Sequence, residues 1–446
     1  MNPVKIAFVL FFICVNSSDA NVFIPNVASS PQPVGSGARA LGIGAFIGVA
    51  DDATASSWNP GGLRMLRSPE ISFVLTSIHR SESLFFSNNP ESNKEHGIQL
   101  EDLNYLSIAY PVELFYRNMA FAISYQHLYD FTKSWRMPMV LQQIDGEIGD
   151  QSLFTVDQVL DYQQSGRLSA IGLSYCIEII PELSFGLTLN IYDNDLTSNN
   201  WEETLNVNGT MSITPLGPLA GEQPVFIPNS FLTRPFDVTI KQKYIFGGIN
   251  FNLGMLWDIN QDFTLGWVFK SPFRGDLEID DGETKVTNKM DLPMTFGVGF
   301  SYKHSNQFKV SLDISRTDWQ KCRYTDVDGI EKSLISDKPL AESDVKPTHQ
   351  VRMGFEYRFE QRSKQLIIPL RAGIYYDPSP SEGSNDDYYG FSIGLGVSRF
   401  ARFGLDVSYC YRFGNDVGAA VLSSYPHTFS QDVSENSLYS SLVLHF

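Results

Sequence analysis

Apolar and polar residues alternate strictly in several segments of this chain. From Val351 to Phe359 every odd-numbered residue is apolar and every even-numbered one is polar or glycine. The segments from Phe308 to Ile314 and from Leu405 to Phe413 follow the same pattern, apart from Cys410 at a polar position of the second. Successive side chains of a β-strand point to opposite faces. Each segment therefore predicts a strand with one face in an apolar environment and the other in a polar one.

Such strands recur along most of the chain, and the connections between them alternate between long and short. We place about fourteen strands near residues 70–79, 103–112, 118–127, 167–177, 182–192, 237–257, 262–271, 293–303, 307–317, 349–360, 366–377, 389–398, 403–413 and 437–446. The long connections include 128–166 and 192–236, and the short ones include 258–261 and 399–402. An even strand number with short turns at one end and long loops at the other is typical of bacterial outer-membrane proteins. The fold class we expect is all-β, a transmembrane antiparallel β-barrel.

The first twenty residues read as a secretory signal peptide. Lys5 is followed by an apolar run from Ile6 to Val15 and by a small-x-small end at Ser18-Asp19-Ala20. After this segment no run of eighteen apolar residues occurs, which excludes a membrane protein built from helices. We therefore divide the chain into a signal peptide (1–20), an N-terminal segment (21–66) and a barrel (67–446).

The segment from Gly35 to Leu63 fits neither a strand nor a long helix. Its seven glycines lose much backbone entropy when they become ordered, and its alanines and serines bury little apolar surface in return. Gly42, Gly44 and Gly48 resemble a nucleotide-binding loop, but their spacing is GxGxxxG and prolines precede them instead of a strand. This composition instead predicts a segment packed inside a container, as a plug inside the barrel would be.

The same segment resembles the N-terminal hatch of the FadL family of outer-membrane transporters for long-chain fatty acids and hydrocarbons. The match lies in Ala50-Asp51-Asp52-Ala53 and in Asn59-Pro60, with Gly61 where the family usually has alanine. Three later stretches, at 292–299, 370–380 and 387–396, are similar to the family as well, although Tyr388 stands where arginine is common. Residues 128–235 show no such similarity.

The resemblance implies a location, a function and a set of gating residues. It implies a bacterial outer membrane protein that transports long-chain fatty acids or other hydrophobic compounds passively, gated by the hatch that plugs its lumen. The hatch residues that it singles out are Gly42, Gly44, Asp51, Asp52, Asn59 and Pro60.

An amphiphilic substrate requires apolar walls for its tail and a fixed donor for its carboxylate. Phe46 and Trp58 of the hatch are candidate apolar contacts, as are Phe226 and Phe231 in the apolar run from Pro224 to Leu232. Arg371 is our candidate cation among the charged residues on the inward faces of the strands. An alternative assigns these inward charges to a network that fixes barrel and hatch, and it assigns the apolar run to a lid over the barrel mouth.

The last strand carries Leu438, Leu442, Leu444 and Phe446 on one face. This ending resembles the C-terminal assembly signal of outer-membrane barrels, so the barrel-insertion machinery and outer-membrane lipid are expected partners. The face assignment also predicts that charge at the outward Phe355 destabilises the barrel far more than charge at the inward Gly354.

The remaining chemistry of the sequence argues against several other functions. A net charge of −17 disfavours a nucleic-acid partner. The acidic pairs at Asp280-Asp281 and Asp386-Asp387 and the run from Asp326 to Gly329 lack a full calcium loop, and the seven histidines fit no catalytic or metal motif. We therefore expect neither an enzyme nor a cofactor. Two alternatives stay open: a barrel that does not transport, acting as an adhesin or as a carrier subunit of a secretion system, and an ion channel, which would need an unplugged lumen.

Overall fold

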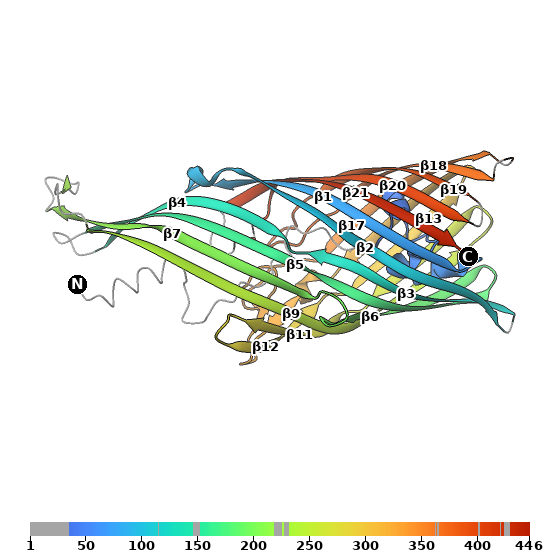
Figure 1. Ribbon diagram of the computed structural model, residues 1–446, viewed down its shortest axis with the longest axis horizontal. Coiled ribbons are helices and arrows are strands. Elements are labelled where there is room, and N and C mark those ends of the chain that lie inside the picture. Colours follow the sequence, from blue (N-terminus) through green and yellow to red (C-terminus); the bar gives the residue numbers. More distant parts are fainter. Residues whose placement is uncertain are drawn as a thin grey trace.

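The strands of this chain close into a barrel. A computed structural model describes residues 35–114, 116–145, 152–217, 225–226, 232–361, 363, 365–399, 402–419, 421–422 and 429–446. Strand β1 (Glu70–Phe86) pairs in antiparallel register with β2 (Glu95–Leu114) and also with the last strand, β21 (Phe429–His445), which completes a ring of fourteen strands. Figure 1 shows the ring from the side. The predicted all-β fold of about fourteen strands is confirmed.

Between β2 and β21 the barrel strands follow one another in chain order. They are β3 (Arg117–Asp130), β5 (Ser152–Ile180), β6 (Leu183–Tyr192), β9 (Leu232–Asp258), β10 (Phe263–Lys270), β13 (Thr295–Lys303), β14 (Phe308–Thr317), β17 (Thr348–Gln361), β18 (Leu366–Tyr376), β19 (Tyr389–Arg399) and β20 (Phe403–Val417). Because neighbours in sequence are neighbours in the wall, all of these pairs are antiparallel.

The two faces of the wall have the predicted polarity. In β17, Arg352 and Glu356 are buried toward the lumen, whereas Val351, Tyr357 and Phe359 are 39%, 38% and 49% exposed on the outer surface. A lipid-facing surface needs this apolar outer row, since a charge at the bilayer midplane is costly. None of the helices in the described residues has the length and apolar character needed to cross a membrane.

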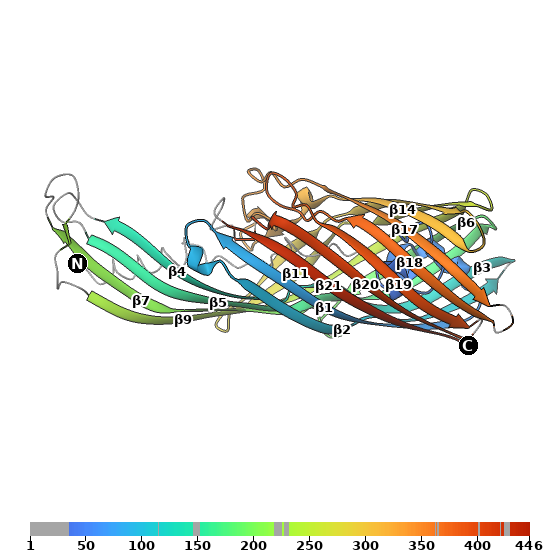
Figure 2. The ribbon, with the colours of Figure 1, turned by 90° about the horizontal axis from the view of Figure 1, so that it is seen from above.

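A curved sheet extends the barrel at the end opposite the C-terminus (Figure 2). It contains the first halves of β5 and β9 together with β4 (Lys133–Asp145) and β7 (Asn200–Gly217), in the order β4-β5-β7-β9. β5 has 29 residues, so at about 3.3 Å per residue it spans roughly 95 Å, far more than the bilayer core. We call this four-stranded region the extension.

The extension corrects one expectation from the sequence. Residues 128–166 and 192–236 are not merely loops. β4 lies within the first range and pairs with β5, and β7 lies within the second and pairs with both β5 and β9. On β4 the side chains of Lys133, Trp135, Met137 and Met139 point to one buried face. This is a period-two pattern, and Pro138 lies on the opposite face. Pairing supplies the hydrogen bonds that backbone groups of an isolated loop would take from water.

Shorter strands line the mouth of the barrel beside the extension. A hairpin of β11 (Phe273–Asp280) and β12 (Lys285–Leu292) pairs with β9, and β15 (Arg323–Thr325) and β16 (Glu331–Ser333) continue the same sheet. β8 (Val225–Phe226) pairs with the end of β7. Two single 3-10 turns, η2 (Pro90–Ser92) and η3 (Trp319–Lys321), complete the loops.

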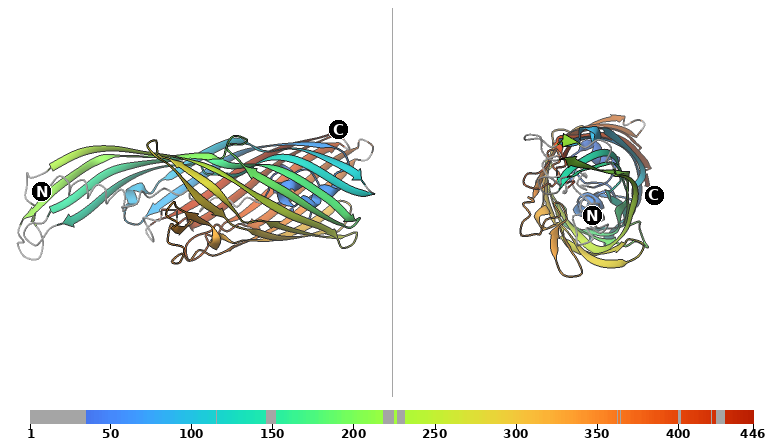
Figure 3. Two further views of the ribbon diagram at one scale, coloured as in Figure 1. Left: turned by 90° about the horizontal axis from the view of Figure 1, so that it is seen from below. Right: turned by 90° about the vertical axis from the view of Figure 1, so that its left-hand side faces the viewer.

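The N-terminal segment lies inside the barrel. From Gly35 it forms α2 (Ala38–Ile43), α3 (Ala55–Trp58) and the 3-10 helix η1 (Pro60–Met65), which leads into β1. Figure 3 shows these blue elements within the ring of strands. They pack against small luminal side chains of β2, β3 and β5, namely Ala109, Ala120, Ala122 and Cys176. We call residues 35–66 the hatch.

Candidate functional site: the hatch and the luminal cavities

Glycines on both partners let the hatch lie directly on the barrel wall. A Cβ atom on Gly42 would lie 3.2 Å from the Cα of Gly394, and one on Gly48 would lie 3.0 Å from the carbonyl of Gly299. From the wall side, a Cβ on Gly354 would lie 2.2 Å from the carbonyl oxygen of Ile43. A contact of 2.2 Å is not tolerated, and contacts of 3.0 and 3.2 Å would force backbone atoms to move, so the small residues of the hatch match small residues of the strands.

Gly44 is required for a further reason. Its φ of +86° lies in the left-handed region and ends α2 in a turn. A side chain there would be strained whatever space surrounded it. The predicted hatch residues Gly42 and Gly44 thus serve separate needs, one for close approach and the other for backbone conformation.

Polar side chains of the wall hold the backbone of the hatch. Asp313 accepts hydrogen bonds through Oδ2 from the N–H groups of Phe46 (2.5 Å) and Ile47 (2.8 Å). Ser311 donates to the carbonyl of Ala45 at 3.0 Å, and Ser392 donates to that of Gly42 at 3.1 Å. Such bonds are needed because the buried backbone groups of an irregular segment have few other partners.

Asn59 joins two parts of the hatch to the barrel. Its Nδ2 donates to the carbonyl of Ile47 (2.8 Å) and to that of Met255 on β9 (2.9 Å), while its Oδ1 accepts from the N–H of Gly61 (3.1 Å). The side chain therefore caps η1, whose first residue is Pro60, where a missing N–H costs nothing. This geometry gives a physical reason for the Asn-Pro pair.

Asp51 and Asp52 form their ion pairs within the hatch. Both form ion pairs with Arg39 of α2, with one Asp51 contact at 3.0 Å. Arg39 Nε also lies 3.6 Å from Glu356 of β17. Sequence reasoning did not single out Arg39, although it is the only cation in the stretch from Gly35 to Leu63 and its partners lie twelve and thirteen residues later.

Arg371 belongs to the same charged network. Its Nε contacts Glu356 at 2.8 Å, and its guanidinium also pairs with Asp406. Glu356 receives a third cation, Arg358, at 2.8 Å. These residues lie on the side of the hatch that faces the short turns, and Arg371 lines neither of the two cavities described next.

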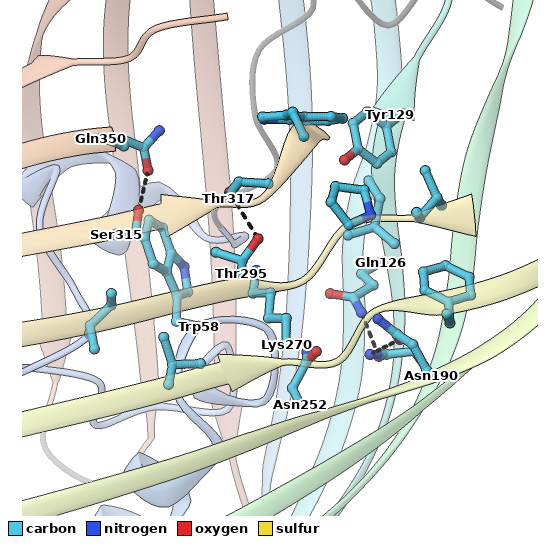
Figure 4. A pocket seen from close by; sticks show the side chains of 18 of the residues that line it. Trp58, Gln126, Tyr129, Asn190, Asn252, Lys270, Thr295, Ser315, Thr317 and Gln350 are labelled. Carbon is cyan, nitrogen blue, oxygen red and sulfur yellow. Dashed lines mark hydrogen bonds between the residues drawn. The ribbon is translucent and has the colours of Figure 1, made fainter. Parts of the chain in front are cut away.

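A cavity of about 990 Å³, partly continuous with solvent, lies on the other side of the hatch. We call it the first cavity. Its walls come mainly from the strand ends that lead into the long connections and the extension. Apolar side chains form much of the lining, including Ile47, Trp58, Tyr192, Val268, Phe273 and Trp319. Figure 4 shows Trp58 of the hatch near Asn252 and Lys270, with Gln126 bonded to Asn190 at 2.8 Å.

Of the predicted ligand contacts, Trp58 therefore lines the first cavity. Phe46 is fully buried next to Trp58. The two rings meet edge to face, with 5.7 Å between their centroids. The side chain of Phe226 and all of Phe231 lie outside the described residues. Phe446 is 64% exposed at the rim of the barrel.

Arg352 is the functional candidate that sequence reasoning passed over. It lines the first cavity, is 7% exposed, and stacks its guanidinium on the ring of Tyr375 at 4.5 Å. Among the described residues no carboxylate lies within 4 Å of it, and its Nε has no hydrogen-bond partner. A buried cation without a paired anion is expensive, so this position is suited to an anionic ligand group.

The acidic turns show no metal geometry. Asp281 accepts hydrogen bonds from the N–H groups of Glu283 (2.9 Å) and Thr284 (2.7 Å), and Asp326 accepts from those of Asp328 and Ile330. Within the described part of the chain, no group of three or more His, Cys, Asp or Glu side chains is placed to hold a metal ion.

A closed barrel with an apolar outer face, a plug of small residues and a luminal cavity behind the plug defines a plugged outer-membrane channel. Comparison of sequences then gives the family. Residues 28–437 match the outer membrane protein transport family (OMPP1/FadL/TodX), and this chain belongs to it. It is accordingly an outer-membrane protein of a family that transports hydrophobic compounds.

Solved structures of low sequence identity share the fold. A FadL homologue from Pseudomonas aeruginosa is similar with a TM-score of 0.58 and 12% identity, over 94% of this chain and 100% of the other. The toluene transporter TodX of Pseudomonas putida is similar with a TM-score of 0.51 and 12% identity, over 93% of this chain and 99% of the other. Among curated protein sequences, none matches this chain.

Proposed function

We propose that this protein carries long-chain fatty acids or related amphiphilic hydrophobic compounds passively across the outer membrane, with the hatch as its gate. The observation that carries this proposal is the composition of the first cavity. Its lining combines apolar side chains of wall and hatch with one buried arginine, Arg352, that has no carboxylate within 4 Å in the described part of the chain. A hydrocarbon tail gains about 25 cal/mol for each Å² of surface that it buries there.

Arg352 is our candidate for the head-group ligand in place of Arg371. A carboxylate at Arg352 would satisfy a guanidinium that lacks an anion, and charge-assisted hydrogen bonds of this kind are among the strongest available. Arg371 already has two carboxylate partners. To bind a ligand it would first have to break those pairs.

The gating proposal rests on Asp313. This residue lines the first cavity, and the same carboxylate holds two N–H groups of the hatch. Its neighbour in register on β17 is Arg352. The guanidinium of Arg352 therefore serves two anions: the head group of the ligand and Asp313, the carboxylate that accepts the two hydrogen bonds from the hatch. An anion bound at Arg352 weakens the support that Arg352 gives to Asp313, and the hatch loosens at Phe46 and Ile47.

Uptake measurements test the proposal. Cells that produce the protein should take up labelled oleate or a labelled aromatic hydrocarbon faster than cells without it. Arg352→Met should lower the ratio of oleate uptake to hydrocarbon uptake severalfold, because only the carboxylate uses the cation as a ligand, whereas a loosened hatch affects both compounds. Equal uptake with and without the protein would exclude the transport function.

Asp313→Ala tests the gate separately. It removes both acceptor bonds to the hatch, each worth about 1.5–3 kcal/mol when the acceptor is charged. We expect higher conductance of small solutes in planar bilayers. Asp276→Ala, at an exposed position of the β11–β12 hairpin, is the matched control and should leave conductance as in the wild type. Identical conductance of the two variants would show that Asp313 does not hold the gate.

The second candidate, a surface adhesin or secretion carrier, is favoured by one observation. The extension projects well beyond the barrel, and a transporter of small molecules does not obviously need so large a surface. Such a protein would co-purify with a partner protein from the cell surface. Finding a stoichiometric partner, together with no uptake, would favour this function.

A further inference from the structure

A second cavity, of about 1180 Å³ and also partly open to solvent, lies beside the first one in the lumen. Strands β1 to β3, β17, β18, β20 and β21 form most of its walls, Lys270 of β10 adds to them, and Gly35, Ser36 and Ser57 of the hatch contribute to it. The two cavities share five lining residues: Gln126, Leu128, Tyr129, Lys270 and Arg352. They therefore meet at the two shared cations.

The chemistry of the second cavity differs from that of the first. The first is lined by three charged side chains, Lys270, Asp313 and Arg352. The second is lined by four cations, Arg80, Lys270, Arg352 and Arg412. It is also lined by four carboxylates, those of Asp102, Asp130, Asp377 and Glu435. Its formal charges thus balance, whereas the first cavity has two cations and one carboxylate.

Most of the charges in the second cavity are held in fixed pairs. Arg80 lies 2.8 Å from Glu435, Arg412 lies 3.0 Å from Asp377, and Asp102 pairs with Arg167. Fixed pairs of opposite charge favour a ligand that carries separated charges of its own. They disfavour a single unbalanced anion, which would approach several carboxylates at once.

Two unpartnered polar groups face this space from opposite walls. Arg352 has no anion among the described residues, and Asn104 Oδ1 is buried without a hydrogen-bond partner. Asn104 is the extra residue of a β-bulge, since Leu103 pairs with Leu75 and Tyr105 with Val74. Bulges commonly redirect a side chain beside a functional site. An acceptor and a donor are therefore both available for one ligand head group.

We propose that the substrate is an amphiphile with a zwitterionic head group, its tail in the first cavity and its head in the second. This inference rests on the proposed transport function and, among the amphiphiles named there, favours those with a zwitterionic head group over fatty acids. The anionic part of the head, such as a phosphate, pairs with Arg352 at the junction. The cationic part lies toward the carboxylates and the rings of Tyr129, Tyr375 and Tyr439, which attract cations. A hydrocarbon without a head group would leave the charged side chains of the second cavity to water.

Three dodecyl probes with different heads test the inference on the full mature protein held in amphipol. They are dodecylphosphocholine, dodecanoate and dodecanol, titrated by calorimetry or native mass spectrometry. We expect dodecylphosphocholine to bind about tenfold or more tightly than the other two, as two additional charge-assisted contacts imply. Dodecanoate binding equally or more tightly would overturn the zwitterionic head while leaving the transport proposal standing. If none of the three binds, both proposals fail.

Two asparagine variants locate the head group. Asn104→Leu removes the unpartnered acceptor of the second cavity, and Asn252→Leu removes a buried unpartnered acceptor of the first. We expect Asn104→Leu to weaken dodecylphosphocholine binding severalfold without affecting dodecanol, because the amide oxygen faces the trimethylammonium group as a dipole and not as a hydrogen-bond acceptor. We expect Asn252→Leu to change all three affinities by a similar factor. If Asn104→Leu left dodecylphosphocholine unchanged, the head group would not lie in the second cavity. Should Asn104→Leu not fold, the ranking of the three probes on the wild-type protein still decides.

Discussion

At the scale of single residues, the position of a side chain relative to the hatch decides its role. Arg371 and Arg352 are both inward arginines on neighbouring strands, β18 and β17. Arg371 lies on the turn side of the hatch and is neutralised by Glu356 and Asp406. Arg352 lies on the cavity side and stacks on Tyr375 without an anion among the described residues. Identical side chains thus serve structure in one place and suit ligand binding in the other.

Gly354 shows the same dependence on position. An inward arginine at this position was expected to cost less than one on the lipid face, and the structure adds that any side chain there would meet the carbonyl of Ile43. We predict that Gly354→Arg leaves the barrel folded and displaces the hatch, which raises bilayer conductance. Phe355→Arg, on the lipid face, should instead lower the unfolding free energy by about 2 to 4 kcal/mol.

Refolding titrations in lipid and conductance measurements separate these two effects. As a control, Gly404→Ala adds a methyl group at an inward position with neighbours no closer than 3.8 Å. It should change neither quantity. Wild-type conductance in Gly354→Arg would mean that the hatch is not seated on this glycine.

At the scale of elements, the base of the extension is a row of polar side chains across four strands. Lys133, Gln164, Glu203 and Gln242 are successive neighbours in register on β4, β5, β7 and β9. Glu203 accepts hydrogen bonds from Tyr244 (3.3 Å) and Tyr162 (3.4 Å). Burial raises the pKa of Glu203 to about 8 and lowers the pKa of Lys133 to about 8.

This row of side chains predicts that the stability of the extension depends on pH. An unfolded glutamate has a pKa near 4.5, so between about 4.5 and 8 the folded state binds the additional proton at Glu203. Its contribution to stability is therefore largest at the acidic end of this window and is lost as the pH rises through it. Lys133 changes the pH dependence of stability little in this window, because it loses its proton only near pH 8. We expect hydrogen-exchange protection of β7 amides, corrected for intrinsic rates, to fall from pH 5 to pH 8.

Glu203→Gln is the matched variant for that measurement. Glutamine keeps an acceptor for the two tyrosines and removes the titrating proton. Protection in this variant should be nearly constant over the same range. A slope equal to that of the wild type would assign the pH dependence to another group.

At the scale of the whole molecule, closure of the ring and plugging of the lumen are separate events. Closure depends on β21, which pairs with β1 at seventeen positions from Glu70 to Phe86. Phe446 follows this strand, lies exposed at the outer rim, and donates its N–H to the carbonyl of Pro69 at 3.1 Å. Its position is compatible with the assembly role that the sequence predicts.

We predict that deletion of Phe446 lowers the folded fraction in cells severalfold. The reason is that an exposed terminal ring buries little surface in the folded barrel, so its main effect should be on assembly. Heat-modifiability on a gel measures the folded fraction. Phe446→Tyr, which keeps an aromatic end, should assemble as the wild type, and an unchanged fraction after deletion would refute the assembly role.

Removal of residues 35–61 should open the lumen without preventing closure. The strands that form the ring begin at Glu70, and the hatch contributes no strand to it. We expect the truncated barrel to fold and to conduct small polar solutes. Asn59→Ala, which breaks the bonds to Ile47 and Met255, should give an intermediate conductance. A truncated barrel that stays closed would show that the hatch is not the plug.

The sequence by itself determined the barrel, because alternation is a local property. Each strand repeats with period two, and the apolar row must face lipid wherever the strand lies, so strand number, faces and the all-β class follow from the chain read in order. The composition of the hatch was equally informative, since a run of glycine, alanine and serine cannot be stable without a container. The family motifs at Asp51-Asp52 and Asn59-Pro60 located the hatch within the chain.

Only the tertiary structure decided which inward residues meet the hatch and which meet the cavities. Period two assigns a side chain to the lumen but does not say how far along the barrel axis it lies. For this reason Arg371 and Arg352 were equivalent in sequence, and Arg39 had no visible partner. The pairing of β4 and β7 with the long ends of β5 and β9 also depends on contacts between distant segments. Register across strands, set by hydrogen bonds between residues far apart in the chain, fixes both the extension and the two cavities.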